Sequence, residues 1–157
     1  MERTRIVSSE PVTIAASREA VWAILTDLPN YHLWNPLSAR IESSLDLGSR
    51  VKLWVNNAGI TGKVEVFEHR LVEKLPPEHL AWAYEKGDVR TRRDQYLAPA
   101  DGGCIYTTTD TFYGPQADPM MDQMGEAISQ SFNALAAALK VFAESGDGPA
   151  TGIAPIV

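Results

Sequence analysis

Apolar and polar residues alternate with a period of two along most of the chain, and the period changes in two segments. The alternation predicts β-strands near residues 4–14, 37–45, 50–56, 62–73, 79–86, 91–98 and 104–113. Short runs of Gly, Pro, Asn and Asp, which favour tight turns, separate most of these strands. Successive short strands joined by tight turns predict an antiparallel meander of about seven strands.

Two segments have the helical period instead. Ser17 is a candidate N-cap, the apolar residues that follow it recur at i, i+3, i+4 and i+7, and Pro29 ends this first helix. The same period over residues 119–144 predicts a second helix, about 39 Å long. Its apolar face consists of Met121, Met124, Ile128, Phe132, Leu135, Leu139 and Phe142. A small sheet covers so long a helix only by curling around it, so the pattern predicts an α+β fold.

Residues 1–145 are expected to form one domain, which suits a chain of 157 residues. Gly, Asp, Pro and Ala dominate from Ser145 onward, so residues 146–157 are expected to be a disordered tail.

The composition of the chain limits the classes of binding partner and the cellular compartment that we expect for this protein. A net charge of −6 without a dense basic stripe argues against nucleic acid, and the local cluster Arg90, Arg92 and Arg93 is interpreted as a solvated strand face. The single cysteine, Cys104, forms no internal disulfide and is interpreted as a small buried apolar residue. With no signal-peptide core and no run of roughly 20 apolar residues, we expect a cytoplasmic protein without stable membrane insertion. The sequence leaves a homodimer open.

Motifs for metals and cofactors are missing. His32, His69 and His79 are widely spaced and do not follow a zinc-ligand pattern. The chain also contains no G-x-G-x-x-G, Walker A or G-x-S-x-G motif. We therefore predict no metal and no organic cofactor.

Several segments resemble one superfamily. Residues 12–22 (VTIAASREAVW) resemble its opening strand and helix, and residues 25–36 (LTDLPNYHLWNP) its following short helical segment. Residues 80–82 (LAW), the stretch from Gly102 to Gly114, and residues 132–140 are similar to two later strands and the closing helix. Over residues 6–145 the chain thus resembles the SRPBCC superfamily, which includes START lipid-transfer domains and birch-pollen-allergen proteins, and within it the polyketide cyclase/dehydrase-like proteins most closely.

The resemblance implies a helix-grip fold, in which a curved antiparallel sheet wraps around a long C-terminal helix and leaves a cavity between them. Relatives often carry a histidine in the strand equivalent to residues 91–98, where this chain has Arg92, Arg93 and Asp94. The resemblance therefore does not extend to chemistry that depends on that histidine.

Period-two geometry and the family register together suggest the residues that face the cavity. The register places Asp110 and Phe112 inside, and Arg93 on a neighbouring strand, while Tyr84 shares a face with Trp82. The predicted catalytic residues are Asp110, Tyr84 and Arg93, with Tyr106 as an alternative tyrosine. The predicted ligand-binding residues are Trp34, Trp54, Trp82, Tyr106, Thr108, Phe112, Met121, Met124, Ile128 and Phe132.

Two interpretations of the function remain open. The first is a cofactor-independent enzyme that folds a polyketide-like substrate against aromatic walls and cyclises or dehydrates it by acid/base chemistry. The second is a carrier that holds a lipid, a polyketide or another apolar metabolite without transforming it. Both imply a small hydrophobic or aromatic ligand in the cavity.

Overall fold

A computed structural model describes residues 2–57 and 59–145, so the expected tail over 146–157 lies outside the described residues. The chain begins with β1 (Thr4–Ser8) and β2 (Val12–Ile14), followed by α1 (Arg18–Thr26) and the 3-10 helix η1 (Leu28–Leu33). A short β3 (Arg40–Glu42) leads into β4 (Arg50–Asn57), β5 (Lys63–Leu75), β6 (His79–Lys86), β7 (Val89–Ala100) and β8 (Gly103–Tyr113). A 3-10 turn, η2 (Gly114–Gln116), connects β8 to α2 (Ala117–Glu144).

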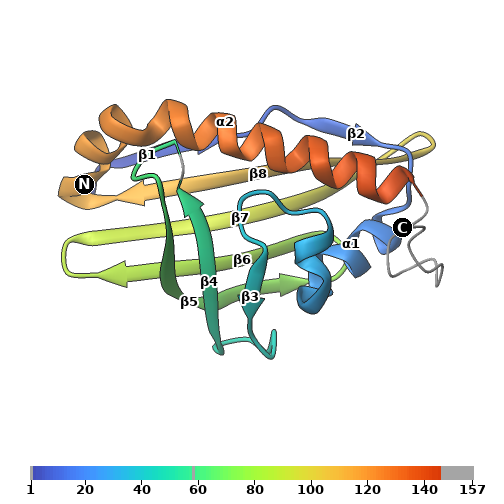
Figure 1. Cartoon of the computed structure of the whole chain (residues 1–157), viewed down its shortest axis with the longest axis horizontal. Coiled ribbons are helices and arrows are strands. Elements are labelled where there is room, and N and C mark those ends of the chain that lie inside the picture. Colours follow the sequence, from blue (N-terminus) through green and yellow to red (C-terminus); the bar gives the residue numbers. More distant parts are fainter. Residues whose placement is uncertain (1, 58, 146–157) are drawn as a thin grey trace.

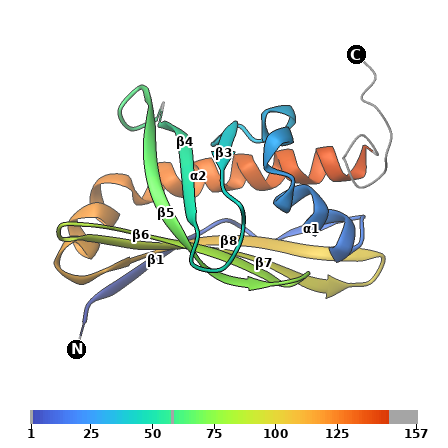
Figure 2. The same ribbon diagram turned by 90° about the horizontal axis from the view of Figure 1, so that it is seen from below.

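The eight strands form one antiparallel sheet in the order β1-β8-β7-β6-β5-β4-β3, with β2 also paired to β8. In Figure 1, α2 crosses one face of this sheet along its length. Figure 2 shows β3, β4 and the first half of β5 turning out of the plane of β6, β7 and β8 toward the side that α2 occupies. The curved sheet around a C-terminal helix confirms the helix-grip fold predicted from the sequence.

The first strand differs from its prediction. Residues 4–14 form two strands, because an extra residue interrupts the pairing with β8: Thr4 lies opposite Tyr113, whereas Val12 lies opposite Tyr106, a register shift of one residue. At the break, the Ser9 amide donates to the Thr108 carbonyl (2.9 Å) and Ser9 Oγ accepts from the Thr108 amide (3.1 Å). Pro11, which has no N–H to donate, also falls in the break.

The helix ends are set by local chemistry. Ser17 caps α1 as predicted, with its hydroxyl accepting from the Ala20 amide at 3.1 Å. The long helix starts at Ala117, two residues before its predicted start, so Asp118 lies in its first turn instead of capping it. There Asp118 pairs with Arg5 at 2.6 Å and Arg3 at 3.1 Å. The helix start is thereby fastened to β1.

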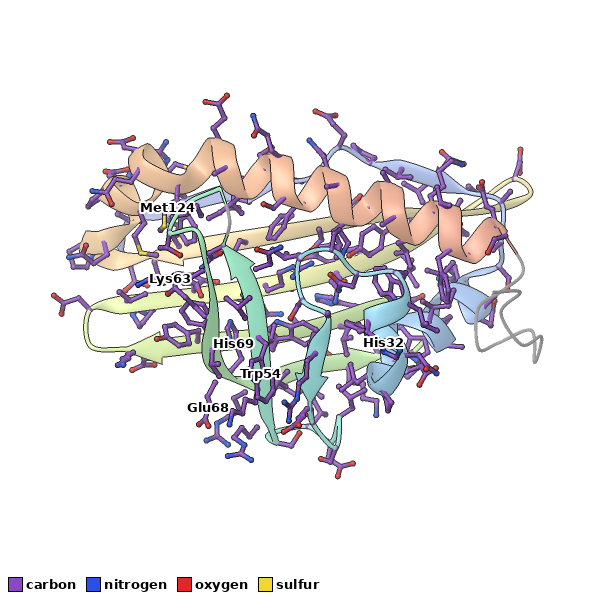
Figure 3. The ribbon with its side chains drawn as sticks, viewed as in Figure 1. His32, Trp54, Lys63, Glu68, His69 and Met124 are labelled. Carbon is purple, nitrogen blue, oxygen red and sulfur yellow. The ribbon has the colours of Figure 1, made fainter. Side chains whose placement is uncertain are left out.

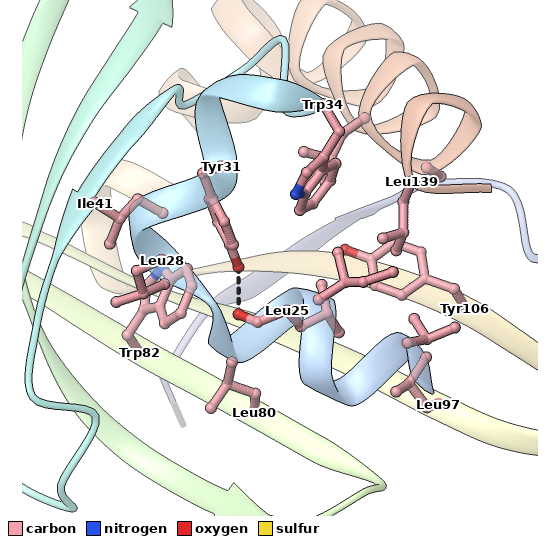
Figure 4. Packing of buried hydrophobic residues seen from close by; sticks show 14 of the residues in the cluster. Leu25, Leu28, Tyr31, Trp34, Ile41, Leu80, Trp82, Leu97, Tyr106 and Leu139 are labelled. Carbon is pink, nitrogen blue, oxygen red and sulfur yellow. Dashed lines mark hydrogen bonds between the residues drawn. The ribbon is translucent and has the colours of Figure 1, made fainter. Parts of the chain in front are cut away.

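The main hydrophobic core fills one end of the space between sheet and helices (Figure 4). Tyr31 of η1 is buried there and donates its hydroxyl proton to the Leu25 carbonyl at 2.6 Å. Trp34 meets the Tyr31 ring edge-on and stacks on Phe142 of α2. α1 and η1 therefore occupy this end of the sheet.

Candidate functional site

A cavity of about 180 Å³ lies between the sheet and the N-terminal half of α2. Met124 of α2 and His69 of β5, labelled in Figure 3, mark two of its sides. Its walls are mostly apolar, and the β4–β5 hairpin contributes to them through Val55 and Ile60. For comparison, a cavity of roughly 150 Å³ holds one benzene molecule. The space therefore suits one or two rings of a small molecule.

The hydroxyl, amide, imidazole, guanidinium and carboxyl side chains that line this cavity are those of Asn57, His69, Tyr84, Thr91, Arg93, Asp110 and Ser131. Six of these seven residues come from strands β4 to β8, and Ser131 comes from α2. Arg93 of β7 and Asp110 of β8 are direct cross-strand partners, so their side chains project from one face of the sheet. The cavity thus has a cation and a carboxylate side by side in apolar surroundings.

Arg93 is held from two directions. Its Nε donates to Thr108 Oγ1 at 2.8 Å, and that hydroxyl in turn donates to the Asp94 carbonyl at 2.9 Å. Its guanidinium carbon lies 4.4 Å from the centre of the Phe132 ring, a cation–π distance. These contacts fix the side chain and leave other N–H donors of the guanidinium for a ligand.

Asp110 is a cavity residue whose pKa is shifted into the neutral range. Within the described residues, no hydrogen bond or ion pair reaches its carboxylate, although part of its surface faces the cavity. Desolvation by burial raises the pKa of Asp110 to about 7, against the lowering effect of Arg93. A carboxyl group with such a pKa can both accept and donate a proton near neutral pH.

His69 is a functional candidate that the sequence interpretation missed. Burial, and then the charge of Arg93, lower the pKa of His69 to about 4, so its ring is neutral at neutral pH. Its Nδ1 is buried without a hydrogen-bond partner in the described structure, and its ring lies 5.2 Å from that of Tyr84. A strand position on the same face as Phe67 and Leu71 was the available signal. The cavity therefore has a histidine, although on β5 instead of the strand at 91–98.

The structure brings together eight of the predicted site residues around the cavity. They are Asp110, Tyr84, Arg93, Trp82, Phe112, Met124, Ile128 and Phe132. Their roles in binding or catalysis stay predictions.

Five predicted ligand-binding residues lie elsewhere. Trp34 and Tyr106 belong to the packed core, where the Tyr106 hydroxyl donates to Gln95. Trp54 lies on the outer face of β4, with the guanidinium of Arg40 4.0 Å from its ring centre. Thr108 is fully buried behind Arg93, and Met121 packs beside Gly125 whereas the neighbouring Met120 lines the cavity.

Two physical causes explain the positions of Tyr106, Trp34 and Trp54. Residue periodicity indicates which face of a strand is turned inward, but not how far along the strand the interior is already filled. Tyr106 and Trp34 do point inward, and α1 and η1 cover them. Trp54 points away from the cavity. Its neighbours Leu53 and Val55 line the cavity, and successive side chains of a strand point to opposite faces.

Within residues 2–57 and 59–145, no group of three or more His, Cys, Asp or Glu side chains is arranged to hold a metal ion. In the same part of the chain, no helix has the length and hydrophobicity needed to span a membrane.

The fold and its cavity define a helix-grip protein of the ligand-binding type. In sequence, residues 5–141 match the family model described as polyketide cyclase / dehydrase and lipid transport, and the chain belongs to this family. No curated protein matches the chain.

Solved structures agree with this fold. The chain is similar to the Zhui aromatase/cyclase from Streptomyces sp. R1128, with a TM-score of 0.74 and 20% identity over 96% of this chain and 100% of that one. It is also similar to a START superfamily protein from Mycobacterium smegmatis (TM-score 0.67, 22% identity, 89% and 97% covered). A third is norcoclaurine synthase from Thalictrum flavum (TM-score 0.65, 11% identity, 94% and 99% covered).

Proposed function

We propose that the chain is a cofactor-independent enzyme that cyclises or dehydrates a small polyketide-like molecule in the cavity. One observation carries the proposal: Asp110, a carboxyl group without a hydrogen-bond partner among the described residues, lies opposite Arg93 in an apolar cavity. The family to which the chain belongs and the similarity to an aromatase/cyclase support this class of reaction.

The chemistry follows from the charges. The ionised Asp110 removes a proton from a CH₂ group between two carbonyls of the substrate, and the electron pair moves onto a carbonyl oxygen beside Arg93. The enolate carbon then bonds to a second carbonyl carbon of the same chain, whose oxygen takes the proton from the Asp110 carboxyl group and becomes a hydroxyl group. The ionised Asp110 next removes the remaining proton from the former CH₂ carbon, the C–O bond breaks, and Asp110 returns that proton to the departing hydroxyl, which leaves as water.

The remaining polar groups have supporting roles in this scheme. Tyr84 and the neutral His69 lie on the wall formed by β5 and β6, where each can hydrogen-bond to a substrate carbonyl or hydroxyl. The aromatic rings of Trp82, Phe112 and Phe132 confine the folded substrate, so that its reacting carbons stay close together.

A short poly-β-ketone thioester tests the proposal. Wild-type protein should convert it to a cyclised, dehydrated product detected by mass spectrometry, with a rate that rises through an inflection near pH 7 as Asp110 ionises. Asp110→Asn should abolish turnover while retaining binding, and Arg93→Gln should lower turnover strongly. Asp88→Asn, in the β6–β7 turn, is the matched control and should behave as wild type.

The carrier function is the second candidate, because most of the cavity wall is apolar. It predicts saturable binding without conversion, equal in wild type and Asp110→Asn. That result would contradict the enzyme proposal.

A further inference from the structure

A row of arginines crosses the outer face of the sheet, on the side away from α2. Arg50 of β4 is the direct cross-strand partner of Arg70 on β5, and Arg70 lies opposite Ala83 of β6. Ala83 is in turn the partner of Arg92 on β7. Since neighbouring strands are about 4.8 Å apart, Arg70 and Arg92 stand roughly 10 Å apart on either side of a methyl group. The result is a groove with an alanine floor and arginine walls.

Like charges directly opposite each other destabilise a sheet, so this row needs an explanation other than stability. Arg50 has one exposed ion pair, with Glu68 at 3.4 Å, and Arg92 is paired with Asp94 at 3.0 Å. No carboxylate of the described chain lies within ion-pair distance of Arg70, whose Nη1 donates to the Gly48 carbonyl at 2.5 Å. Arg70 therefore keeps a positive charge that the described residues do not neutralise.

Arg70 is the arginine of this groove whose charge is available to a ligand. The lining contains four arginines, the three above and Arg90, and two carboxylates, Glu68 and Glu85. Glu68 pairs with Arg50, and two carboxylates from outside the lining, Asp94 and Glu2, pair with Arg92 and Arg90. Among the described residues, Arg70 has no such partner, so its guanidinium favours an anionic occupant.

The groove meets the internal cavity where β5 and β6 separate. β5 pairs with β4 from Lys63 onward, but it pairs with β6 only from Arg70, opposite Ala83. β6 nevertheless continues to Lys86, so the two strands diverge beyond this point (Figure 2). His69, Tyr84 and Thr91 line both the cavity and the outer groove. The cavity and the arginine row thus lie on opposite sides of this gap, and the contacting rings of His69 and Tyr84 stand between them.

We propose that the groove between Arg70 and Arg92 binds an oxyanion, a carboxylate or a phosphate, at one end of the molecule whose apolar part occupies the cavity. The connecting arm passes between β5 and β6, beside His69 and Tyr84. Arg70 supplies a planar guanidinium group, which binds carboxylate or phosphate through paired N–H donors. The substrate class is therefore an apolar ring system that carries an anionic arm. This inference rests on the proposed function only in that the apolar part must enter the cavity.

Matched acid and amide probes test the site. The probes have a 2-naphthyl ring linked to a carboxylate through zero, two or four methylene groups, each paired with its neutral primary amide, and binding is followed by fluorescence titration at low salt. For at least one arm length the acid should bind about tenfold more tightly than the amide. That advantage should shrink as the salt concentration rises.

Two variants test whether the tighter binding of the acids depends on the groove. Arg70→Gln should remove the preference for the acid without changing the affinity for the amide. Arg40→Gln is the control, because Arg40 is an exposed arginine on the same face of the sheet, paired with Glu42 and outside the groove. Denaturant unfolding of both variants checks that they are folded. Phosphate monoesters on the same arms distinguish a phosphate from a carboxylate as the preferred anion.

The outcomes separate the two proposals. If the amides bind and no acid binds better than its amide, the oxyanion site is wrong and the cavity proposal stands. An acid preference that Arg70→Gln and Arg40→Gln reduce equally also overturns the site, because it would reflect the overall charge. If neither acids nor amides bind, both proposals fail.

Discussion

Asp110 and Asp118 are two carboxylates of one chain whose surroundings shift their pKa values in opposite directions. Burial in the cavity raises the pKa of Asp110 to about 7. Hydrogen bonds from Arg5 and Arg3 lower the pKa of the exposed Asp118. Asp118 has hydrogen-bond donors and contact with water, both of which favour the charged carboxylate, whereas burial of Asp110 favours the neutral carboxyl group. The same residue type therefore has a raised pKa at one site and a lowered pKa at the other.

Asp110→Asn should change how stability depends on pH. The unfolded chain ionises Asp110 near its ordinary pKa of 3.8, whereas the folded protein retains the proton until about pH 7. The folded state therefore loses stability as pH rises from about 4 to 7, by at most roughly 4 kcal/mol. Urea unfolding should show Asp110→Asn close to wild type at pH 4 and more stable than wild type at pH 8.

Asp118→Asn provides the opposite sign. Because the folded-state pKa of Asp118 is lowered, its stabilising effect is present above the unfolded pKa and disappears as pH falls. This variant should be less stable than wild type at pH 8 and equal to it in acid. If Asp110→Asn shows the same trend as Asp118→Asn, Asp110 has a charged partner in solution and the isolated carboxyl proposed here is wrong.

Part of the residue-level picture could be predicted from the sequence. Alternation within β8 places Asp110 and Phe112 on one face, and the need to bury Phe112 identifies that face as the inner one. That Asp110 has no hydrogen-bond partner among the described residues, and that His69 lies beside the cavity, both depend on contacts between strands far apart in the sequence. No local pattern carries that information.

Two glycines, Gly102 in the turn between β7 and β8 and Gly103 at the start of β8, allow the tight turn and the close packing of β2 against β8. Gly102 has a positive φ of 74°, and Gly103 lies against β2, where an added Cβ would come within 1.9 Å of the Ile14 carbonyl oxygen. The close approach lets Ile14 pair with Cys104 at the start of β8. The two glycines therefore serve different purposes, one conformational and one steric.

Gly103→Ala should be much more destabilising than Gly102→Ala. The Gly103 substitution forces the backbone of β2 away from β8, since a carbonyl oxygen cannot give way as a side chain could, and a loss of roughly 3 kcal/mol or more is expected. The Gly102 substitution has open space around its Cβ and costs only the strained φ, about 1 kcal/mol. Denaturant unfolding of the two variants measures the difference, and equal losses would contradict the steric explanation.

Most elements could be predicted because they are long and strongly periodic. The strands β4 to β8 and the helix α1 lie close to their expected ranges, as does the long helix. Residues 37–45 were expected to be one strand, but the strand covers only Arg40–Glu42. Before it, Asn35 Oδ1 accepts from the Leu37 and Ser38 amides and holds the chain in a turn, and after it Ser43 Oγ accepts from the Leu45 amide. Such side-chain-to-backbone bonds compete with strand pairing and are hard to detect from periodicity.

At the scale of the whole molecule, α2 divides the interior into a packed part and an open part. Its C-terminal half packs through Leu135 and Leu139 into the main core beneath α1 and η1. Its N-terminal half covers the cavity through Met124, Ile128 and Phe132. A second, smaller buried cluster that includes Phe112, Ala117 and Phe132 packs beside the cavity. The larger core and the cavity therefore lie along different halves of one helix, so substitutions on that helix can address them separately.

Ile128→Trp should block the cavity without unfolding the protein. The larger side chain occupies much of the roughly 180 Å³ that the ligand would fill, and its new contacts offset the strain of a tighter fit. We expect a melting temperature equal to or above that of wild type, and loss of saturable binding of 2-naphthol. In wild type, the same ligand should raise the melting temperature by mass action, so the variant should also lose this ligand-dependent increase.

Val141→Trp is the matched control, because Val141 lies on the same helix and is 68% exposed to solvent. This variant should bind 2-naphthol as wild type does and show the same ligand-dependent increase in melting temperature. Two results would contradict the proposed binding position. Unchanged binding by Ile128→Trp would mean that the ligand lies outside the cavity, and equal loss of binding in both variants would place it along the solvent-facing side of α2.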